Sequence, residues 1–228
     1  MKNNFLNLFL VMGLIMGVSS CKDDKTNEVS ATEAAEAKTA SAEAIQYEID
    51  TTASEMKWRG TKPTGEHVGT IDIQSGHFTA KDGKIESGTV VIDMNSVAVT
   101  DANISDEDRE NLENHLKGTV EGKETDFFNV KKFPTATFEI TGTTERDGKT
   151  FLQGNLTLKD STKNIEFPVD TKLSNDGKTL VIESERFIID RTDWGVNYGS
   201  QSVFDNLGDN FISDDMELSF NVTAHNKS

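Results

Sequence analysis

Few side chains in this sequence have the types and spacing that chemistry requires. The four histidines, His67, His77, His115 and His225, lie in different segments and lack the short spacings of zinc ligands. The sequence contains no Gly-x-Ser-x-Gly turn and no His-Glu-x-x-His motif. The 39 acidic residues guarantee chance carboxylate pairs, so abundance alone identifies no acid–base pair. We therefore expect a protein that is not an enzyme and that has no catalytic residue, metal ligand or obligatory cofactor.

The single cysteine, Cys21, follows a segment typical of an export signal. Lys2 precedes an apolar run, Phe5 to Val18, that is too short for a comfortable membrane span. The run ends in Val18-Ser19-Ser20-Cys21, and small residues before a lone cysteine resemble a bacterial lipoprotein cleavage box. We expect residues 1–20 to be a lipoprotein signal peptide and Cys21 to be lipidated; a plain signal peptide is the alternative.

Lipidation at Cys21 would place the protein in the bacterial cell envelope. Each buried methylene contributes about 0.8 kcal/mol, so two or three acyl chains would anchor it stably to the outer membrane. Lys22-Asp23-Asp24 resembles a surface-export signal of Bacteroidetes-type lipoproteins, with a solvated charge run as the alternative. Residues 21–44 are rich in Ala and Glu and contain no aromatic residue, which predicts a disordered linker reaching about 26 Å.

The overall charge also limits the partners. The 228-residue chain has a net charge of −16, which argues against a nucleic-acid partner because such binding requires clustered Lys and Arg. One cysteine permits no internal disulfide. A homodimer is left open.

From residue 45 onward, short runs alternate apolar and polar residues, which predicts β-strands. The runs lie at 45–50, 56–61, 68–75, 89–94, 135–141, 151–159, 165–169, 180–189 and 216–224. Asp-Gly pairs at 82–83, 147–148 and 176–177 supply the positive φ of tight hairpins. This spacing predicts an all-β domain over residues 45–228, either an antiparallel barrel or a sandwich.

Two segments depart from the strand pattern. Ser105 to Lys117 has an N-cap residue, an acidic first turn and Gly118 beyond its end, which predicts a short helix across the mouth of the barrel. The segment Asp126 to Ile140 contains four phenylalanines, of which Phe127, Phe128 and Phe133 precede the strand that begins at Thr135. Such residues either plug the end of a barrel or line its mouth, and the pattern alone favours the plug.

Several motifs together resemble the YceI-like family of lipocalin-like barrels. They are Tyr47-Glu48-Ile49-Asp50, Gly76-His77-Phe78, Val90 to Val97, Leu112 to Lys117, Asp126 to Val130, Phe133 to Phe138, Gly154 to Lys159, and Ile189 to Val196. Gly118 to Thr125 lengthens a link that is usually short, and Asp160-Ser161-Thr162 lacks a glycine that the family often carries. The resemblance implies an antiparallel lipocalin-like β-barrel of about eight strands with one or two short helices.

The resemblance further implies that a polyisoprenoid-type lipid, such as a quinone side chain or a polyprenyl phosphate, lies in an apolar cavity. Each isoprene unit would contribute roughly 3–4 kcal/mol at about 0.8 kcal/mol per carbon, before ordering costs. Inward residues would form the wall, although each is also explained by core packing: Ile71, Ile73, Ile92, Phe138, Ile140, Leu156, Leu158, Phe167, Phe187 and Phe220.

The mouth of this cavity would include the aromatic segment and the motif around Arg191. Arg191 either faces a polar head group or braces the end of a strand, and the brace is favoured. Trp194 and Tyr198 either cap the cavity or pack under a loop. His115 is interpreted as a solvated helix residue rather than a ligand contact. The alternative to a lipid-binding lipoprotein is a filled barrel that binds another envelope component through its surface.

Overall fold

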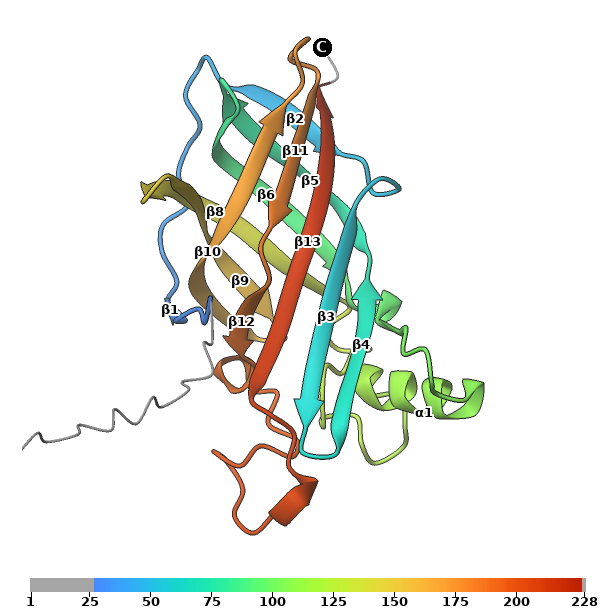
Figure 1. Cartoon of the computed structure of the whole chain (residues 1–228). Helices are drawn as coiled ribbons and strands as arrows, with labels where there is room; N and C mark the ends of the chain where they lie inside the picture. Colours follow the sequence, from blue (N-terminus) through green and yellow to red (C-terminus); the bar gives the residue numbers. More distant parts are fainter. Residues whose placement is uncertain (1–26, 227–228) are drawn as a thin grey trace, which may run out of the picture.

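The computed structural model describes residues 27–226, which form a closed antiparallel barrel with one helix at its lower end (Figure 1). The expected signal peptide and Cys21 lie outside the described residues. The strands of the barrel are β2 (Ile45–Ile49), β5 (Ile73–Lys81), β6 (Lys84–Asp93), β8 (Thr135–Arg146), β9 (Lys149–Leu158), β10 (Ser161–Leu173), β11 (Thr179–Ser184) and β13 (Asp215–Asn226). Their order is β2-β5-β6-β8-β9-β10-β11-β13, and β13 pairs again with β2. The prediction of an eight-stranded antiparallel barrel is confirmed.

Four further strands complete the wall, three of them in the lower half. These three are β3 (Glu55–Lys62), β4 (Gly65–Ile71) and β12 (Phe187–Asp190), and β7 (Ala98–Val99) pairs with β4. One edge of β13 pairs with β3 over residues 216–221 and with β2 over residues 224–226. Its other edge pairs with β11 and then with β12. The same strand therefore closes both halves of the barrel.

Two predicted strands are each broken in two. The run 68–75 breaks at Asp72, whose N–H donates to Ser96 Oγ at 2.7 Å and whose carbonyl accepts from Asp93 N–H at 2.9 Å. Because Ile71 and Ile73 are both buried, the alternation passes through the break unchanged and does not reveal it. The run 180–189 breaks between β11 and β12, where the inward positions shift from even to odd numbers.

The predicted helix is confirmed as α1 (Asp106–Lys117). Ser105 caps it by accepting the N–H of Asp108 at 3.1 Å, and Gly118 ends it in the left-handed region at φ 68°. Three 3₁₀ turns, η1 (Met94–Ser96), η2 (Arg191–Trp194) and η3 (Gly208–Asn210), complete the elements. Within residues 27–226, no helix has the length and apolar character that would let it cross a membrane.

Residues 27–44 differ from the expected disordered linker, because they lie along the outer wall of the barrel (Figure 1). We call this segment the N-terminal arm. Its strand β1 (Thr32–Glu33) pairs with Asn164 and Lys163 of β10. Nearer its start, the arm exchanges backbone hydrogen bonds of 2.8 and 3.0 Å with Ile188 of β12. Since β10 pairs with β11 only from Val169 onward, the arm bridges the lower seam between β10 and β12.

An asparagine on β9 holds the next part of the arm. Asn155 Oδ1 accepts the N–H of Ala35 at 2.9 Å, and Asn155 Nδ2 donates to the carbonyl of Ala35 at 2.7 Å. Asn164 Nδ2 also donates to Asn155 Oδ1 at 3.0 Å. Asn155 is consequently buried although it points away from the core. The prediction of a disordered linker came from composition, which does not report hydrogen bonds. Hydrogen bonds hold much of the arm, and Val29 is the one buried apolar residue among residues 27–44.

We predict that Asn155→Ala loosens the N-terminal arm. The change removes both hydrogen bonds to Ala35 and should lower the free energy of unfolding by about 1–3 kcal/mol. Urea denaturation measures this loss, and limited proteolysis should show faster cleavage within residues 34–40. Thr157→Ala is the matched control, since Thr157 lies on the same strand and bonds only the exposed Thr162 at 2.8 Å. Unchanged proteolysis in Asn155→Ala would contradict the proposed role of the clamp.

Candidate functional site

The lower half of the barrel contains a cavity of about 490 Å³ that opens at the end covered by α1. Most of its wall is apolar and comes from β3, β4, β6, β8, β9, β12, β13, α1 and the loops around them. The apolar wall residues are Met56, Trp58, Ile71, Ile92, Met94, Val97, Leu112, Leu116, Phe127, Phe128, Leu156, Leu158, Ile189, Val196, Ile212, Met216 and Leu218. The volume falls within the range of small-molecule sites in proteins, roughly 300–1,000 Å³.

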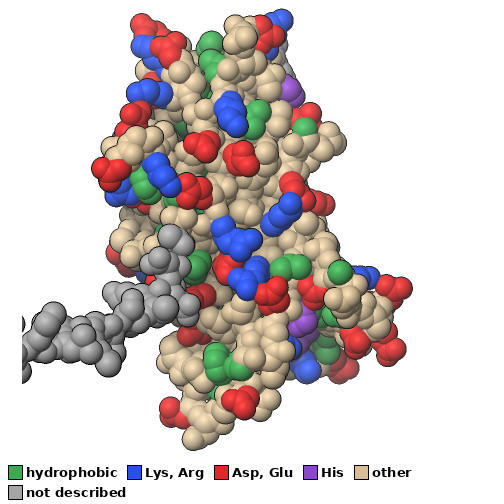
Figure 2. Space-filling view, viewed as in Figure 1, with side chains coloured by type: hydrophobic (Ala, Val, Ile, Leu, Met, Phe, Trp, Pro, Cys, Tyr) green, Lys and Arg blue, Asp and Glu red, His purple; other side chains and the backbone are tan. Residues whose placement is uncertain are grey.

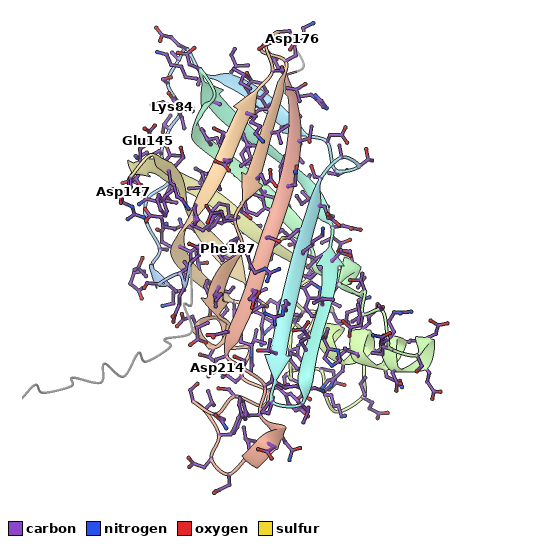
Figure 3. All side chains as sticks on the ribbon, in the orientation of Figure 1. Lys84, Glu145, Asp147, Asp176, Phe187 and Asp214 are labelled. Atoms are coloured by element: carbon purple, nitrogen blue, oxygen red, sulfur yellow. The ribbon has the colours of Figure 1, made fainter. Side chains whose placement is uncertain are left out.

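The barrel interior beyond this cavity is almost filled by aromatic rings. Phe138, Phe167, Phe187 and Phe220 come from four strands, β8, β10, β12 and β13, and we call them the phenyl cluster. Phe167 and Phe187 stack at 4.3 Å, and Phe138 and Phe220 lie 5.5 and 5.7 Å from Phe167. Figure 3 labels Phe187 about halfway along the barrel. A void of only about 60 Å³ remains beside these rings.

The upper end of the barrel is closed. Tyr47 is 2% exposed, and its hydroxyl donates to the carbonyl of Gly177 in the β10–β11 turn at 3.0 Å. Phe78, which pairs with Tyr47 across β5 and β2, is buried, as are Ile85 and Leu180 near the turns at this end. A ligand can therefore enter the main cavity from the lower end.

The structure divides the expected wall residues between the two cavities. Those at the main cavity are Ile71, Ile92, Phe127, Phe128, Leu156, Leu158, Arg191 and Tyr198. Those at the inner void are Ile73, Ile92, Phe138, Leu156, Phe167, Phe187 and Phe220. Ile140, Trp194 and Phe133 are not among the residues that line either cavity.

These last three residues have other contacts. Ile140 is 1% exposed in the core. Trp194 is fully buried, and its indole N–H donates to the carbonyl of Leu156 at 2.9 Å, so it packs behind the wall. Phe133 lies under the ammonium group of Lys132, which is 4.7 Å from the centre of the ring.

The mouth of the cavity carries an aromatic group around His115. His115 Nε2 lies 2.7 Å from Asp126 Oδ2, and its ring meets the rings of Phe127 and Tyr198 edge to face at 5.1 and 5.0 Å. The interpretation of His115 as a solvated helix residue was therefore wrong. The preference for Phe127 and Phe128 as a plug was also wrong, because both side chains line the open cavity.

Arg191 braces the loop that follows η2. Its guanidinium donates to the carbonyls of Ser213 at 2.9 Å, Ile212 at 3.0 Å and Val196. Burial lowers the pKa of Arg191, and the nearby carboxylates of Asp214 and Asp190 oppose this shift. Figure 3 places Asp214 at the lower end of β13. These contacts are the ones that the brace interpretation expects, and they occupy most of the donors of Arg191.

The sequence reasoning missed several wall residues that belong to predicted strands or to the predicted helix. Met56 and Trp58 share one face of a predicted strand, and Leu112 and Leu116 form the apolar stripe of α1. Alternation gave the correct face for these residues. It could not show that this face borders an empty space rather than a packed core.

A loop beside the mouth exposes apolar side chains. Val203 and Phe204 are 46% and 49% exposed, and they belong to the segment between η2 and η3. In the view of Figure 2, this segment forms the lower lobe and carries a group of hydrophobic side chains. Apolar surface is thus presented next to the opening of an apolar cavity.

The cavity also carries a few polar side chains. Within residues 27–226, no group of three or more His, Cys, Asp and Glu side chains could hold a metal ion. Two of the polar side chains at the cavity have partners: His67 Nδ1 lies 2.6 Å from Asp101 Oδ2, and Arg191 donates to backbone carbonyls. The arrangement suits the shelter of an apolar molecule.

The fold and the cavity define a lipocalin-like binding barrel, and the comparisons with known proteins agree. The YceI-like domain model matches residues 47–224, so the chain belongs to the YceI-like family. BcnA of Burkholderia cenocepacia is similar in structure, with a TM-score of 0.57 and 20% identity over 77% of this chain and 99% of that one.

A second similar structure is a domain from Saccharophagus degradans that is described as polyisoprenoid-binding and implicated in plant cell wall breakdown. It has a TM-score of 0.54 and 16% identity, covering 80% of this chain and 99% of that one. No curated protein sequence matches this chain. At these identities, the two structures establish the shared fold.

We predict that Arg191→Lys lowers stability more than it lowers ligand affinity. Lysine cannot reproduce the fork of a guanidinium, so at least two charged hydrogen bonds of about 1.5 kcal/mol each should be lost. Urea denaturation should show a loss of about 3 kcal/mol. Arg109→Lys is the control, because its ion pair with the fully exposed Asp106 contributes little. Unchanged stability with weaker binding of a prenyl phosphate would instead assign Arg191 to a head group.

Proposed function

We propose that this protein binds an isoprenoid lipid in the lower cavity and carries or sequesters it in the bacterial cell envelope without reacting with it. The observation that carries the proposal is the apolar cavity of about 490 Å³, open at one end and closed above. The polyisoprenoid-binding description of a similar domain supports the choice of ligand. The exposed Phe204 and Val203 beside the opening suit contact with a lipid surface during exchange.

The size of the cavity supports useful affinity without polar contacts. A space of 490 Å³ holds about 16 methylene-sized atoms at roughly 30 Å³ each. Their burial would contribute about 13 kcal/mol at 0.8 kcal/mol per carbon. Association costs at least about 4–5 kcal/mol, so the net free energy is at most about 8–9 kcal/mol, which corresponds at best to a dissociation constant somewhat below 1 μM.

The second part of the proposal is that Cys21 anchors the barrel close to the outer membrane. The docked N-terminal arm shortens the tether, because its contacts with β12 begin at Asn27. Positions 21 and 27 are six residues apart, which reach at most about 20 Å. The arm joins the wall in the lower half of the barrel, where the cavity lies (Figure 1).

We predict that Gly60→Phe blocks binding by filling the cavity. Gly60 lines the cavity, and a Cβ added there meets no atom within 4 Å, so a phenyl ring can enter the empty space. Farnesol should bind the wild type and displace the fluorescent probe N-phenyl-1-naphthylamine, whereas the variant should lose at least 30-fold in affinity. Its thermal midpoint should stay the same or rise.

The matched control is Lys57→Phe, which adds the same ring to the outer face of β3 at an exposed position. It should bind farnesol as the wild type does. The proposed function fails if purified wild-type protein neither carries an extractable lipid nor binds farnesol. It also fails if Gly60→Phe binds farnesol with unchanged affinity.

We predict that Cys21→Ser moves the protein from the membrane fraction to the soluble fraction of its host. The substitution removes the thiol that an acyl chain requires, and the barrel itself is unchanged. Fractionation followed by immunoblotting measures the shift, and intact-mass analysis of the wild type should show the added acyl chains. Protease treatment of whole cells then distinguishes surface display from a periplasmic location. A wild-type protein without acyl mass would refute the anchor and leave isoprenoid binding untouched.

A further inference from the structure

The two internal cavities share four wall residues, and we call the level of these residues the neck. Met56, Ile92, Leu156 and Leu218 line both the main cavity and the small inner void. They come from β3, β6, β9 and β13, so they surround the barrel axis at one level. Above this level, free space falls from about 490 to about 60 Å³.

The phenyl cluster lies directly behind the neck. Phe220 pairs with Met56 across β13 and β3, and it is two residues from Leu218 on the same strand. Phe138 pairs with Leu156, and its ring covers Gly154, where an added Cβ would lie 2.2 Å from the ring. Glycine at this position therefore lets the ring reach across the interior.

These contacts make the cluster a rigid floor. The stacked pair Phe167–Phe187 also contacts two other rings: Phe138 is tilted against Phe167, and Phe220 meets both rings of the pair edge to face. Phe167 and Phe187 are each 2% exposed. A chain that enters from the mouth can displace these rings only by disrupting close packing.

We propose that the phenyl cluster sets the length of isoprenoid chain that the barrel shelters, at about three isoprene units. This inference rests on the proposed function, and it specifies the class of ligand. The main cavity holds about 16 carbon-sized atoms, and a three-unit chain has 15 carbons. Further units project from the mouth and bury little additional apolar surface, so they add little affinity.

The test measures affinity against chain length with prenyl alcohols of two, three, four and nine isoprene units. In the wild type, affinity should rise at least tenfold from two to three units and change less than threefold beyond three. In Phe220→Ala, the neck and the inner void should merge with the main cavity. The plateau should then move to four units or more, with at least a tenfold gain for the four-unit alcohol over the three-unit one.

Two further variants keep the test decisive. Phe220→Leu removes less volume and should shift the plateau in the same direction, which covers the case in which Phe220→Ala does not fold. Leu180→Ala destabilises a fully buried position near the closed end that lines neither cavity, and its plateau should stay at three units.

The outcomes separate this inference from the proposed function. A wild type that binds none of the alcohols overturns the function. A wild type whose affinity keeps rising to nine units, or Phe220 variants with an unchanged plateau, overturns the length limit while isoprenoid binding stands.

Discussion

The structure depends on the way β13 is shared between two rings of strands. In the upper half it closes the barrel between β2 and β11, and in the lower half between β3 and β12. A strand of 12 residues can do this because its successive backbone groups face different partners along its length. The lower half is built from more elements, since β3, β4, α1 and the mouth loops are added there. This change of partners along one strand separates a packed half from a hollow half.

The two halves have different physical roles. Close packing in the upper half and in the phenyl cluster at the middle of the barrel, together with the Tyr47–Gly177 hydrogen bond, supplies contacts that the hollow lower half lacks. The lower half is braced by polar groups: Arg191, which lies at the cavity wall, holds three carbonyls of the mouth loops, and Asn155 holds the N-terminal arm. Because these carbonyls occupy most of the donors of Arg191, its burial beside an open and mostly apolar cavity leaves few of its polar groups unpaired.

Much of the fold follows from local signals in the sequence. The Ser105 cap and Gly118 fixed both ends of α1, and the Asp-Gly pairs fixed three hairpins. Alternation also gave the inward face of most strands. It failed at Asp72, where Ile71 and Ile73 keep the same parity on both sides of the break, and in the N-terminal arm, where side chains of distant residues supply the hydrogen bonds.

The division of the site could not be predicted for a related reason. Phe138 and Leu158 are both inward residues on regular strands, yet one borders the nearly filled void and the other borders the main cavity. Alternation reports direction and not depth along the barrel axis. Depth depends on register between strands, such as Phe138 opposite Leu156 and Phe220 opposite Met56, which distant turns determine.

The N-terminal arm connects the closure of the barrel to its placement in the envelope. A disordered linker of residues 22–44 would let the mouth point in any direction about 26 Å from a membrane. In the structure, hydrogen bonds from Asn27 onward take most of that length out of the tether. The same bonds fill the seam between β10 and β12, so the contacts that shorten the tether also close the lower wall. For the anchored protein that we propose, a barrel with a closed wall and an open mouth would therefore be held with its lower half near the membrane.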